Sequence, residues 1–516
     1  MTVHPPVTVV GAGPAGLAAA SAATAAGARV RLIDAEPSPG GQYLRGDALG
    51  RAYDGAKVHG ARVPDGVDYL PDTEVWALEP LPGGGARLHL RTGPADGSGG
   101  AVGAGRADPV GRPGPSTGRT TGEPDAAPPS GTTADDRPGP MGVRSAPSTR
   151  PRADDGRAAP LEATSTVAVH TVDAPVLVLA TGAHDRVLPF PGWDLPGVVT
   201  AGAAQALAKS QRTAIGHNAV VAGTGPFLLP VARSLHGVGA RVAAVLEAGA
   251  PVSGWLGDPG GAAAGLGKLG ELAGHTAALA RRRVPYRTRT AVIEAHGDGA
   301  LEAVTTARLD PRWRPLPGTE RTIAADALCL GFGFTPRLEA AIAAGCATSG
   351  GFVRVDAAQA TSARGVFAAG EPTGIGGAAL AAAEGEVAGT AAARAAGHPV
   401  APPLGALRRV RTGRRFAAGL AAAHPIGPGW KEWPRDDTLV CRCEEVALRD
   451  LHAAARSAPG GRAFRLASRA GLGLCQGRVC GRNTAELIGL TDEDARRFDR
   501  RPIAVPIRLG DLADDT

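Results

Sequence analysis

Four of the six cysteines in this chain stand in two close pairs near its carboxyl end. Cys441 and Cys443 form a C-x-C pair, and Cys475 and Cys480 form a C-x4-C pair after 31 intervening residues. Four thiolates are enough to bind a zinc ion or a [2Fe-2S] cluster. The spacing alone does not choose between the two, but either one places metal or redox chemistry in one compact C-terminal unit.

A glycine-rich turn near the amino end has the residue types that bind a dinucleotide. The segment VTVVGAGPAGLAAASAATAAGARVRLIDAEP, which starts at Val7, predicts a strand, a turn, a helix and a second strand. Gly11 allows the tight turn, Gly13 lets a pyrophosphate approach the backbone, and Gly16 permits close packing of the helix. Asp34 ends the second strand, where its carboxylate can accept hydrogen bonds from an adenosine ribose. The unit therefore favours FAD or NAD over a 2′-phosphorylated nucleotide.

The same pattern occurs a second time in a weaker form. Another strand, turn and helix are predicted from Asn218, with Gly223 and Gly225 in the turn. Leu228 stands where a third glycine would let helix and strand pack, and Glu247 stands at the position of the ribose-binding acid. Two expectations stay open for this domain. Either it binds NAD(P) through Gly223, Gly225 and Glu247, or it keeps the fold and has lost or changed its ligand.

The composition indicates a globular chain of two to four domains with one unusual segment. With 516 residues, 43% of them hydrophobic, the chain can bury a large core. Residues 93–166, in contrast, hold hardly any large apolar side chain, and this composition predicts a disordered insertion. The net charge of +6 comes mainly from scattered arginines, so no nucleic-acid binding is expected. Neither a membrane span nor a signal peptide is recognised, which favours the cytoplasm.

Several motifs together resemble the flavoprotein disulfide reductase superfamily, whose members have two dinucleotide-binding domains. They are the first glycine-rich turn, PGGQ (residues 39–42), ATGA (residues 180–183), the second turn and TSARGVFAAGE (residues 361–371). The resemblance implies FAD at the first turn. It places FAD against Gly11, Gly13, Pro14, Ala15, Gly16, Asp34, Ala35, Gly41, Gln42, Thr181, Gly182, Gly370, Glu371, Gly376 and Gly377. The redox dithiol of thioredoxin and glutathione reductases is absent, because no C-x-x-C or C-x4-C pair precedes residue 441.

The C-terminal unit resembles the [2Fe-2S] domain of bacterioferritin-associated ferredoxin in the form that is fused to flavoproteins. The resemblance rests on CRCEEV (residues 441–446) and RAGLGLCQGRVCGR (residues 469–482). It implies that Cys441, Cys443, Cys475 and Cys480 bind the cluster. Zinc stays the alternative.

Over nearly its full length the chain is similar to the α subunits of opine oxidases, hydroxyproline and proline dehydrogenases and hydrogen cyanide synthase. Segments such as GWDLPGVVTAGAAQ (residues 192–205) and RPIAVPIRLGDL (residues 501–512) extend the resemblance. It implies that the partner is an amine-oxidising flavoprotein β subunit, joined in some cases by a small ferredoxin-like subunit. An amino acid or opine would reach the complex through that partner. No catalytic residue is identified in the chain itself.

The expected fold class is α/β, with two Rossmann-like domains and a small helical bacterioferritin-associated-ferredoxin-like domain. The expected boundaries are 1–92, 167–205 and 330–397 for a discontinuous FAD domain, 93–166 for the insertion, 206–329 for the second dinucleotide domain, 398–435 for a connector, 436–490 for the [2Fe-2S] domain and 491–516 for a tail. The expected function is electron transfer within an amino-acid or opine dehydrogenase complex. A self-sufficient NAD(P)H-dependent reductase and a zinc-holding scaffold for a partner flavoprotein remain the alternatives.

Overall fold

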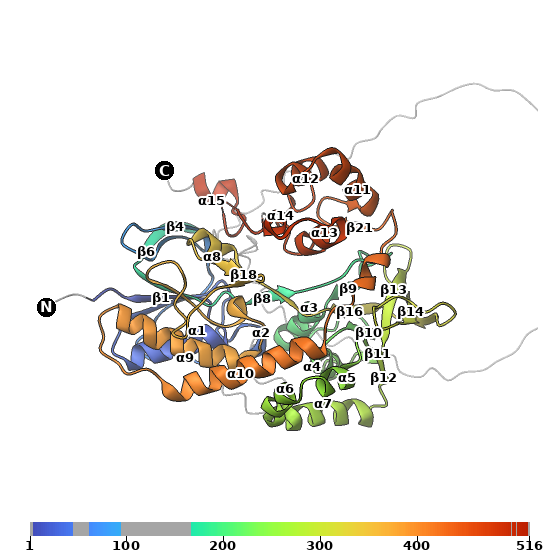
Figure 1. The fold of residues 1–516 in the computed structure, drawn as a ribbon, viewed down its shortest axis with the longest axis horizontal. Coiled ribbons are helices and arrows are strands. Elements are labelled where there is room, and N and C mark those ends of the chain that lie inside the picture. Colours follow the sequence, from blue (N-terminus) through green and yellow to red (C-terminus); the bar gives the residue numbers. More distant parts are fainter. Residues whose placement is uncertain (1–3, 45–60, 94–166, 497, 502, 514–516) are drawn as a thin grey trace, which may run out of the picture. The chain divides into compact units, whose positions relative to one another are not determined.

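A computed structural model describes residues 4–44, 61–93 and 167–513, except residues 497 and 502 (Figure 1). The insertion expected at 93–166 lies outside the described residues apart from Gly93. The strands on either side of it, β5 and β6, pair with each other, with Thr92 opposite Ala168. The insertion therefore occupies the connection between two neighbouring antiparallel strands.

A five-stranded parallel sheet forms the centre of the first dinucleotide domain. Its strand order is β20-β7-β1-β2-β3. The strands are β1 (Val7–Val10), β2 (Val30–Ile33), β3 (Asp68–Leu70), β7 (Val176–Leu179) and β20 (Val366–Ala368). The two central strands β1 and β7 are buried along their whole length, as expected for parallel strands that are covered on both faces.

Helices α1 (Pro14–Ala25) and α9 (Ala378–Ala395) pack closely against each other beside this sheet (Figure 1). Their contact depends on small residues. A Cβ atom on Gly385 or Gly389 would stand 2.0 or 2.1 Å from a carbonyl oxygen of α1. Glycine at these two positions lets the α9 backbone approach α1, and the turn that precedes α9 is thereby held beside the first turn.

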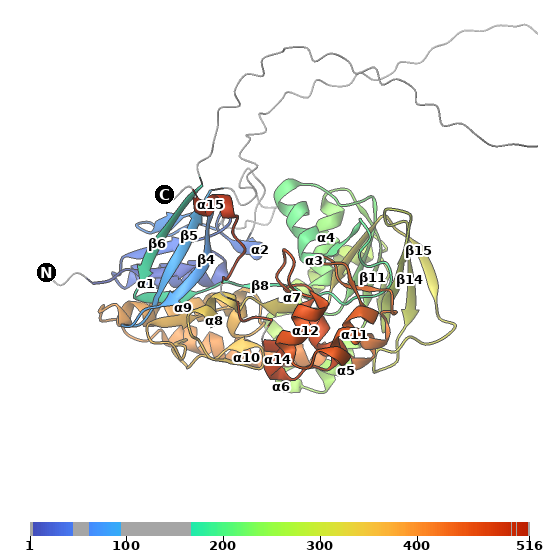
Figure 2. The same ribbon diagram turned by 90° about the horizontal axis from the view of Figure 1, so that it is seen from above.

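An antiparallel sheet and several short elements complete the first domain. The sheet consists of β4 (Thr73–Pro80), β5 (Ala86–Thr92) and β6 (Ala168–Ala174) and is seen at the left of Figure 2. The remaining elements are α2 (Gly41–Leu44), α8 (Glu339–Ala343), β18 (Thr348–Ser349), β19 (Phe352–Val353) and the 3-10 turn Glu371–Thr373.

The second dinucleotide domain repeats the parallel architecture. Its sheet has the order β12-β11-β10-β16-β9. The strands are β9 (Val198–Thr200), β10 (Asn218–Gly223), β11 (Arg241–Glu247), β12 (Tyr286–Thr288) and β16 (Ala327–Gly331). This sheet begins before residue 206, the expected boundary, because β9 pairs with β16 and brings Val198 opposite Leu328. A three-residue edge strand carries no periodicity that could show this pairing in the sequence.

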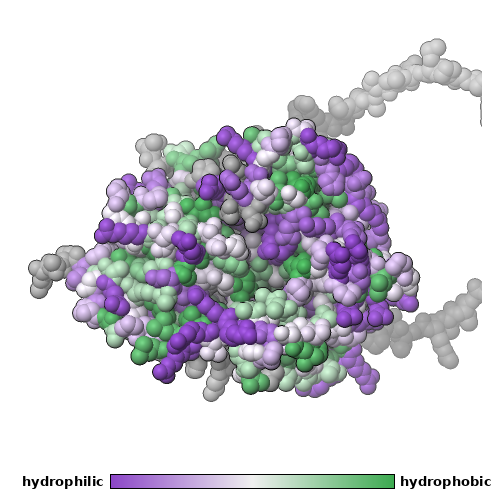
Figure 3. Space-filling view, viewed as in Figure 1, coloured by the Kyte–Doolittle hydropathy of each residue, from purple (hydrophilic) through white to green (hydrophobic). Residues whose placement is uncertain are grey.

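Helices and an antiparallel sheet surround the second domain. They are α3 (Ala201–Ala206), the π-helical turn Leu207–Gln211, α4 (Leu228–Gly237), α5 (Pro251–Leu256), α6 (Pro259–Ala264), the 3-10 turn Leu266–Lys268, α7 (Leu269–Arg281), β13 (Thr290–His296), β14 (Ala303–Arg308) and β15 (Arg321–Ala324). Two crossing strands, β8 (Ala183–Asp185) and β17 (Phe334–Pro336), join the two dinucleotide domains. Hydrophobic side chains gather over α6 and α7 at the lower edge of Figure 3, where Leu256, Leu266 and Leu272 are exposed.

The connector and the C-terminal unit are more structured than the sequence indicates. The connector contains α10 (Leu404–Ala423) and the 3-10 turn Pro428–Glu432, and α10 packs on α5, α6 and α9. The C-terminal unit consists of β21 (Leu439–Cys441), β22 (Val446–Ala447), α11 (Leu448–Ser457), α12 (Gly461–Ser468), α13 (Gly481–Ile488) and α14 (Asp492–Arg496), and α15 (Leu509–Ala513) follows. Phe498, expected in a tail, is 3% exposed and belongs to the core of this unit. No described helix is both long and apolar enough for a membrane span.

Candidate functional site

A cavity of about 2220 Å³ lies beside the carboxyl ends of both parallel sheets. Its wall includes Gly13 from the first domain, Gly225 from the second and Arg478 from the C-terminal unit. Ligands of open α/β sheets bind at this end of the strands. The cavity therefore joins the three parts of the molecule for which the sequence predicts chemistry.

The first turn, residues 11–16, is built so that only one of its three glycines faces open space. Gly11 has φ of +102°, and a Cβ atom there would stand 2.3 Å from the carbonyl oxygen of Ala180. A Cβ atom on Gly16 would stand 1.7 Å from the carbonyl oxygen of Gly11. At Gly13, by contrast, nothing lies within 4 Å of such an atom. Gly11 and Gly16 thus serve backbone packing, whereas Gly13 leaves room for a pyrophosphate.

Asp34 follows β2 and holds the first turn from the other side. One carboxylate oxygen accepts a hydrogen bond from the backbone N–H of Ala12, and the other accepts one at 2.8 Å from that of Glu36. The residue is 9% exposed and lines the cavity. Its position at the mouth of the turn suits an adenosine ribose.

The structure gathers nearly all residues that were expected to contact FAD into the wall of this cavity. Those that line it are Gly11, Gly13, Pro14, Ala15, Asp34, Ala35, Gly41, Gln42, Thr181, Gly182, Gly370, Glu371, Gly376 and Gly377. Gly16 does not line it, because it faces Gly11 inside the turn. The sequence did not indicate the residues of the opposite wall, which include Glu74, Arg337 and Arg478.

Glu371 has a buried carboxylate oxygen that lacks a partner. Its Oε1 accepts a hydrogen bond at 2.9 Å from the N–H of Gly377, while Oε2 has no hydrogen-bond partner. Burial raises the pKa of the carboxyl group to about 7, and the nearby Glu384 acts in the same direction. A buried acceptor without a donor is unfavourable. A hydroxyl-bearing ligand in this cleft, such as the ribityl chain of a flavin, would satisfy it.

The second turn, residues 223–228, comes together as the pattern predicts, but with a different arrangement of its acid. A Cβ atom on Gly223 would stand 1.7 Å from the carbonyl oxygen of Gly331, so this glycine serves packing. Gly225 faces open space, as Gly13 does. Glu247, however, is 0% exposed and accepts a hydrogen bond at 2.8 Å from the N–H of Gly225.

The four cysteines of the C-terminal unit are in mutual contact. The thiol of Cys480 contacts those of Cys441 and Cys475, and Cys475 also contacts Cys443. These contacts lower the pKa of the Cys441 and Cys475 thiols and raise that of Cys480. Cys441 and Cys480 are each 1% exposed, whereas Cys443 is exposed. The fold therefore brings both pairs to one place.

Backbone N–H groups surround these thiols. Those of Glu444 and Gly471 point at the sulfur of Cys441, and those of Gly477 and Val479 point at that of Cys475. Such donors favour thiolate sulfur over the neutral thiol, and they tune the potential of iron–sulfur clusters. Across the described residues, however, no group of three or more His, Cys, Asp and Glu side chains forms an evident metal-ion site. The kind of metal is therefore inferred from the donor set.

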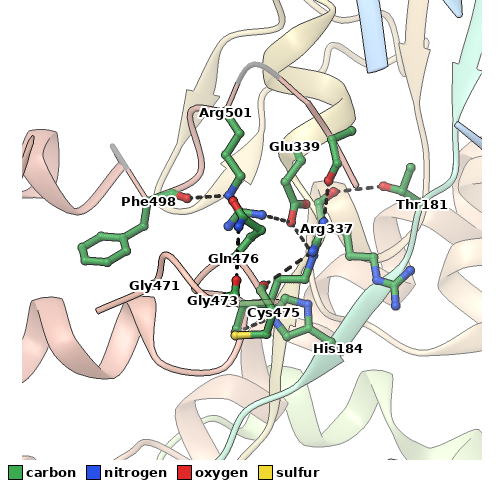
Figure 4. Close-up of polar contacts among 12 residues, drawn as sticks. Thr181, His184, Arg337, Glu339, Gly471, Gly473, Cys475, Gln476, Phe498 and Arg501 are labelled. Atoms are coloured by element: carbon green, nitrogen blue, oxygen red, sulfur yellow. Dashed lines mark hydrogen bonds and ion pairs between the residues drawn. The ribbon is translucent and has the colours of Figure 1, made fainter. Parts of the chain in front are cut away.

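A hydrogen-bonded bridge connects the loop of Cys475 with the FAD cleft (Figure 4). Thr181 donates to the carbonyl oxygen of Arg337 at 2.9 Å, and the N–H of Arg337 donates to that of Gly182 at 3.0 Å. Three residues after Thr181, the Nε2 atom of His184 lies 2.8 Å from the carbonyl oxygen of Arg478. The N–H of Arg478 in turn donates to the carbonyl oxygen of Cys475 at 3.0 Å.

Buried charges reinforce this bridge. The carboxylate of Glu339 pairs with Arg478 at 2.8 Å and with Arg501 at 3.0 Å, and all three side chains are at most 19% exposed. Burial alone would raise the pKa of Glu339, but its contacts with the two arginines hold it below the usual value. Burial also lowers the pKa of His184, so its ring stays neutral and Nε2 donates to the carbonyl group.

Comparison with known proteins agrees with the two dinucleotide folds. The family described as pyridine nucleotide-disulphide oxidoreductase matches residues 152–394, and an NAD(P)-binding Rossmann-like domain matches residues 9–78. A solved structure of L-proline dehydrogenase from P. horikoshii has a TM-score of 0.60 at 16% identity, covering 99% of this chain and 79% of that one. This last likeness concerns the fold.

Curated relatives are named as subunits of oxidising enzymes. The hydrogen cyanide synthase subunit HcnB of Pseudomonas aeruginosa is 34% identical over 329 residues, covering 60% of this chain and 69% of the relative. A subunit of the opine oxidase of Agrobacterium tumefaciens is 29% identical over 554 residues, covering 98% of this chain and 90% of the relative. The chain therefore belongs to the family of FAD-dependent oxidoreductase subunits that includes HcnB of hydrogen cyanide synthase and the matching subunits of opine oxidases.

Proposed function

We propose that this chain is the electron-transferring subunit of an enzyme complex that dehydrogenates an amino acid or opine. Its relatives are named as subunits, which supports a role within a larger assembly. In the relatives named opine oxidase, the matched region covers nearly the whole of this chain. The chain itself supplies two redox sites and the connection between them.

FAD occupies the first cleft in this proposal. Gly13 leaves space for the pyrophosphate, Asp34 accepts hydrogen bonds from the ribose, and Glu371 accepts one from the ribityl chain. Thr181, Gly182, Gly376 and Gly377 line the inner part of the same cavity, where the isoalloxazine ring would lie.

A [2Fe-2S] cluster on Cys441, Cys443, Cys475 and Cys480 is the second redox site. When bound, FAD takes up two electrons at once and the cluster passes them on singly. The four thiols and the backbone donors around Cys441 and Cys475 support the cluster. Arg469 pairs with Glu444 at 2.7 Å and Arg478 pairs with Glu339, so neither guanidinium is directed only at the sulfurs.

The observation that carries the proposal is the bridge through His184. It links the strand that follows Thr181 and Gly182 to the backbone that carries Cys475. Because one cavity is lined by both regions, a flavin in the cleft and a cluster on the cysteines belong to one connected site.

The amine itself is bound by a partner in this proposal. No group of the described residues was found that holds a substrate carboxylate beside a catalytic base. We infer that the partner is an amine-oxidising flavoprotein β subunit, with a small ferredoxin-like protein as a further component. The complex would act in the cytoplasm.

Co-expression tests this function directly. The purified chain alone should reduce a dye only poorly with amino acids or opines as donors, and amine-dependent dye reduction should appear when the amine-oxidising flavoprotein is co-purified with it. In the complex, Cys475→Ser should slow dye reduction more than it slows reduction of the partner's flavin. Rapid amine oxidation by the chain alone would show that it is a complete dehydrogenase and would overturn the proposal.

A further inference from the structure

The acid of the second turn is fully used inside the protein. Glu247 ends β11, and its Oε1 atom accepts hydrogen bonds from the Thr224 hydroxyl at 2.6 Å and from the N–H of Gly249 at 2.8 Å. Its Oε2 atom accepts one at 2.8 Å from the N–H of Gly225 and lies 3.6 Å from Nδ1 of His424. Both carboxylate oxygens are therefore in contact with protein donors.

The first turn offers a comparison within the same chain. Asp34 lines the cavity and is 9% exposed, whereas Glu247 is 0% exposed and does not line it. Space beside the glycine is open in both turns, at Gly13 and at Gly225. The two turns thus differ at the ribose position and not at the pyrophosphate position.

Two residues cause this difference. Thr224 stands where the first turn has Ala12, and its hydroxyl draws the carboxylate of Glu247 into the turn. His424 comes from the connector, directly after α10, and its side chain is 10% exposed above the carboxylate. Burial alone would raise the pKa of Glu247, but its contacts with His424, Thr224 and Gly225 hold it below the usual value.

The connector is fixed in this position by close packing. A Cβ atom on Gly254 of α5 would stand 2.5 Å from Cα of Ala423, the last residue of α10. The rings of Trp255 and Phe416 stack with centroids 5.7 Å apart. Arg415 of α10 also pairs with Asp258, the cap of α6. Displacing His424 would disturb these contacts.

We infer that His424 and Thr224 close the second turn to nicotinamide dinucleotides, and that Glu247 anchors the connector instead of binding a ribose. An adenosine ribose needs a carboxylate that can accept its hydroxyl groups, and this carboxylate is covered. A site whose polar groups are already paired gains little from a ligand that must break those pairs. The inference does not depend on FAD or on the kind of metal.

The consequence concerns the source of electrons. A self-sufficient NAD(P)H-dependent reductase needs an open nicotinamide site in the second domain. With the ribose position closed, NAD(P)H does not deliver electrons through the second turn. Electrons reach this chain from a protein partner.

Titration of the FAD-loaded chain with NADH and with NADPH tests the inference. We expect no saturable binding up to about 1 mM and no bleaching of the flavin. Saturable binding with a Kd below about 100 µM that is lost in Gly225→Val would overturn the inference. Binding that persists in Gly225→Val would lie on another surface and would leave the second turn closed, as inferred.

Amide hydrogen exchange supplies a second readout that needs no nucleotide. In the wild-type chain the amides of Gly225 and Gly249 should be protected, and Glu247→Ala should lose this protection while FAD content stays unchanged. The matched variant Asp34→Ala should instead lose FAD. Unchanged protection in Glu247→Ala would show that the carboxylate does not hold the turn and would contradict its role as an anchor.

Discussion

Glu371 keeps one buried carboxylate oxygen without a donor inside the FAD cleft. Burial raises the pKa of this group from 4.5 to about 7 in the ligand-free chain. The unfolded chain releases the proton at lower pH than the folded chain, so the group stabilises the fold below pH 4.5. This contribution, at most about 3 kcal/mol, is lost as the pH rises through about 7.

A hydroxyl donor at Oε2 would favour the charged carboxylate and lower its pKa. FAD binding should then release a proton, and FAD affinity should rise as the pH increases from about 5 to about 7. Glu371→Gln removes the titrating group, so its FAD affinity should be independent of pH over this range. Fluorescence titration of apoprotein with FAD at several pH values measures both, and equal pH slopes for variant and wild type would speak against this role of Glu371.

The first turn separates ligand space from packing space at two neighbouring glycines. Because nothing lies within 4 Å of a Cβ atom at Gly13, Gly13→Val should fold normally and purify without FAD. Gly16→Ala would bring a methyl group onto the Gly11 carbonyl, and we expect it to cost about 1–3 kcal/mol of stability. Flavin absorbance and thermal melting measure the two effects. A Gly13→Val protein that keeps its full FAD content would show that the flavin lies elsewhere.

At the scale of elements, strand β8 couples the cleft to the loop of Cys475. His184→Ala removes the hydrogen bond to the Arg478 carbonyl, at a cost of about 1 kcal/mol. FAD and iron contents should stay at wild-type levels, while electron transfer from flavin to cluster slows and the potential of the cluster shifts. His184→Gln, whose amide can still donate, should restore both. Stopped-flow absorbance and redox titration measure them, and an alanine variant with wild-type rate and potential would remove His184 from the proposed bridge.

The sequence predicts elements well where the signal is local. The first turn, Asp34 and the segment around Glu371 are short motifs whose residues lie in one strand–turn–helix unit, and the structure places them in one cavity. His184 could not be predicted, because its partner Arg478 is distant in sequence. Glu247 shows the limit most clearly. The same rule identified it and Asp34, but His424 of the connector covers only Glu247.

At the scale of the whole molecule, three separately folded parts share one cavity, and the chain uses that cavity to join two redox sites. Phe498, beyond the expected end of the [2Fe-2S] domain, packs against glycines 471, 477 and 481 of the cysteine region. Arg501 then reaches Glu339 of the first domain. These contacts make the C-terminal segment part of the connection between domains, which composition alone could not show.

The central claim is that the four cysteines hold a [2Fe-2S] cluster. Electron paramagnetic resonance of the purified, anaerobically reduced chain tests it most directly. We expect the signal of one reduced [2Fe-2S] cluster per chain in the wild type and in Cys346→Ser, whose thiol contacts Thr361 and lies outside the cysteine cluster. Cys480→Ser, which removes the thiol that contacts both Cys441 and Cys475, should lose the signal and retain FAD. A wild-type chain without this signal, holding zinc in place of iron, would contradict the account.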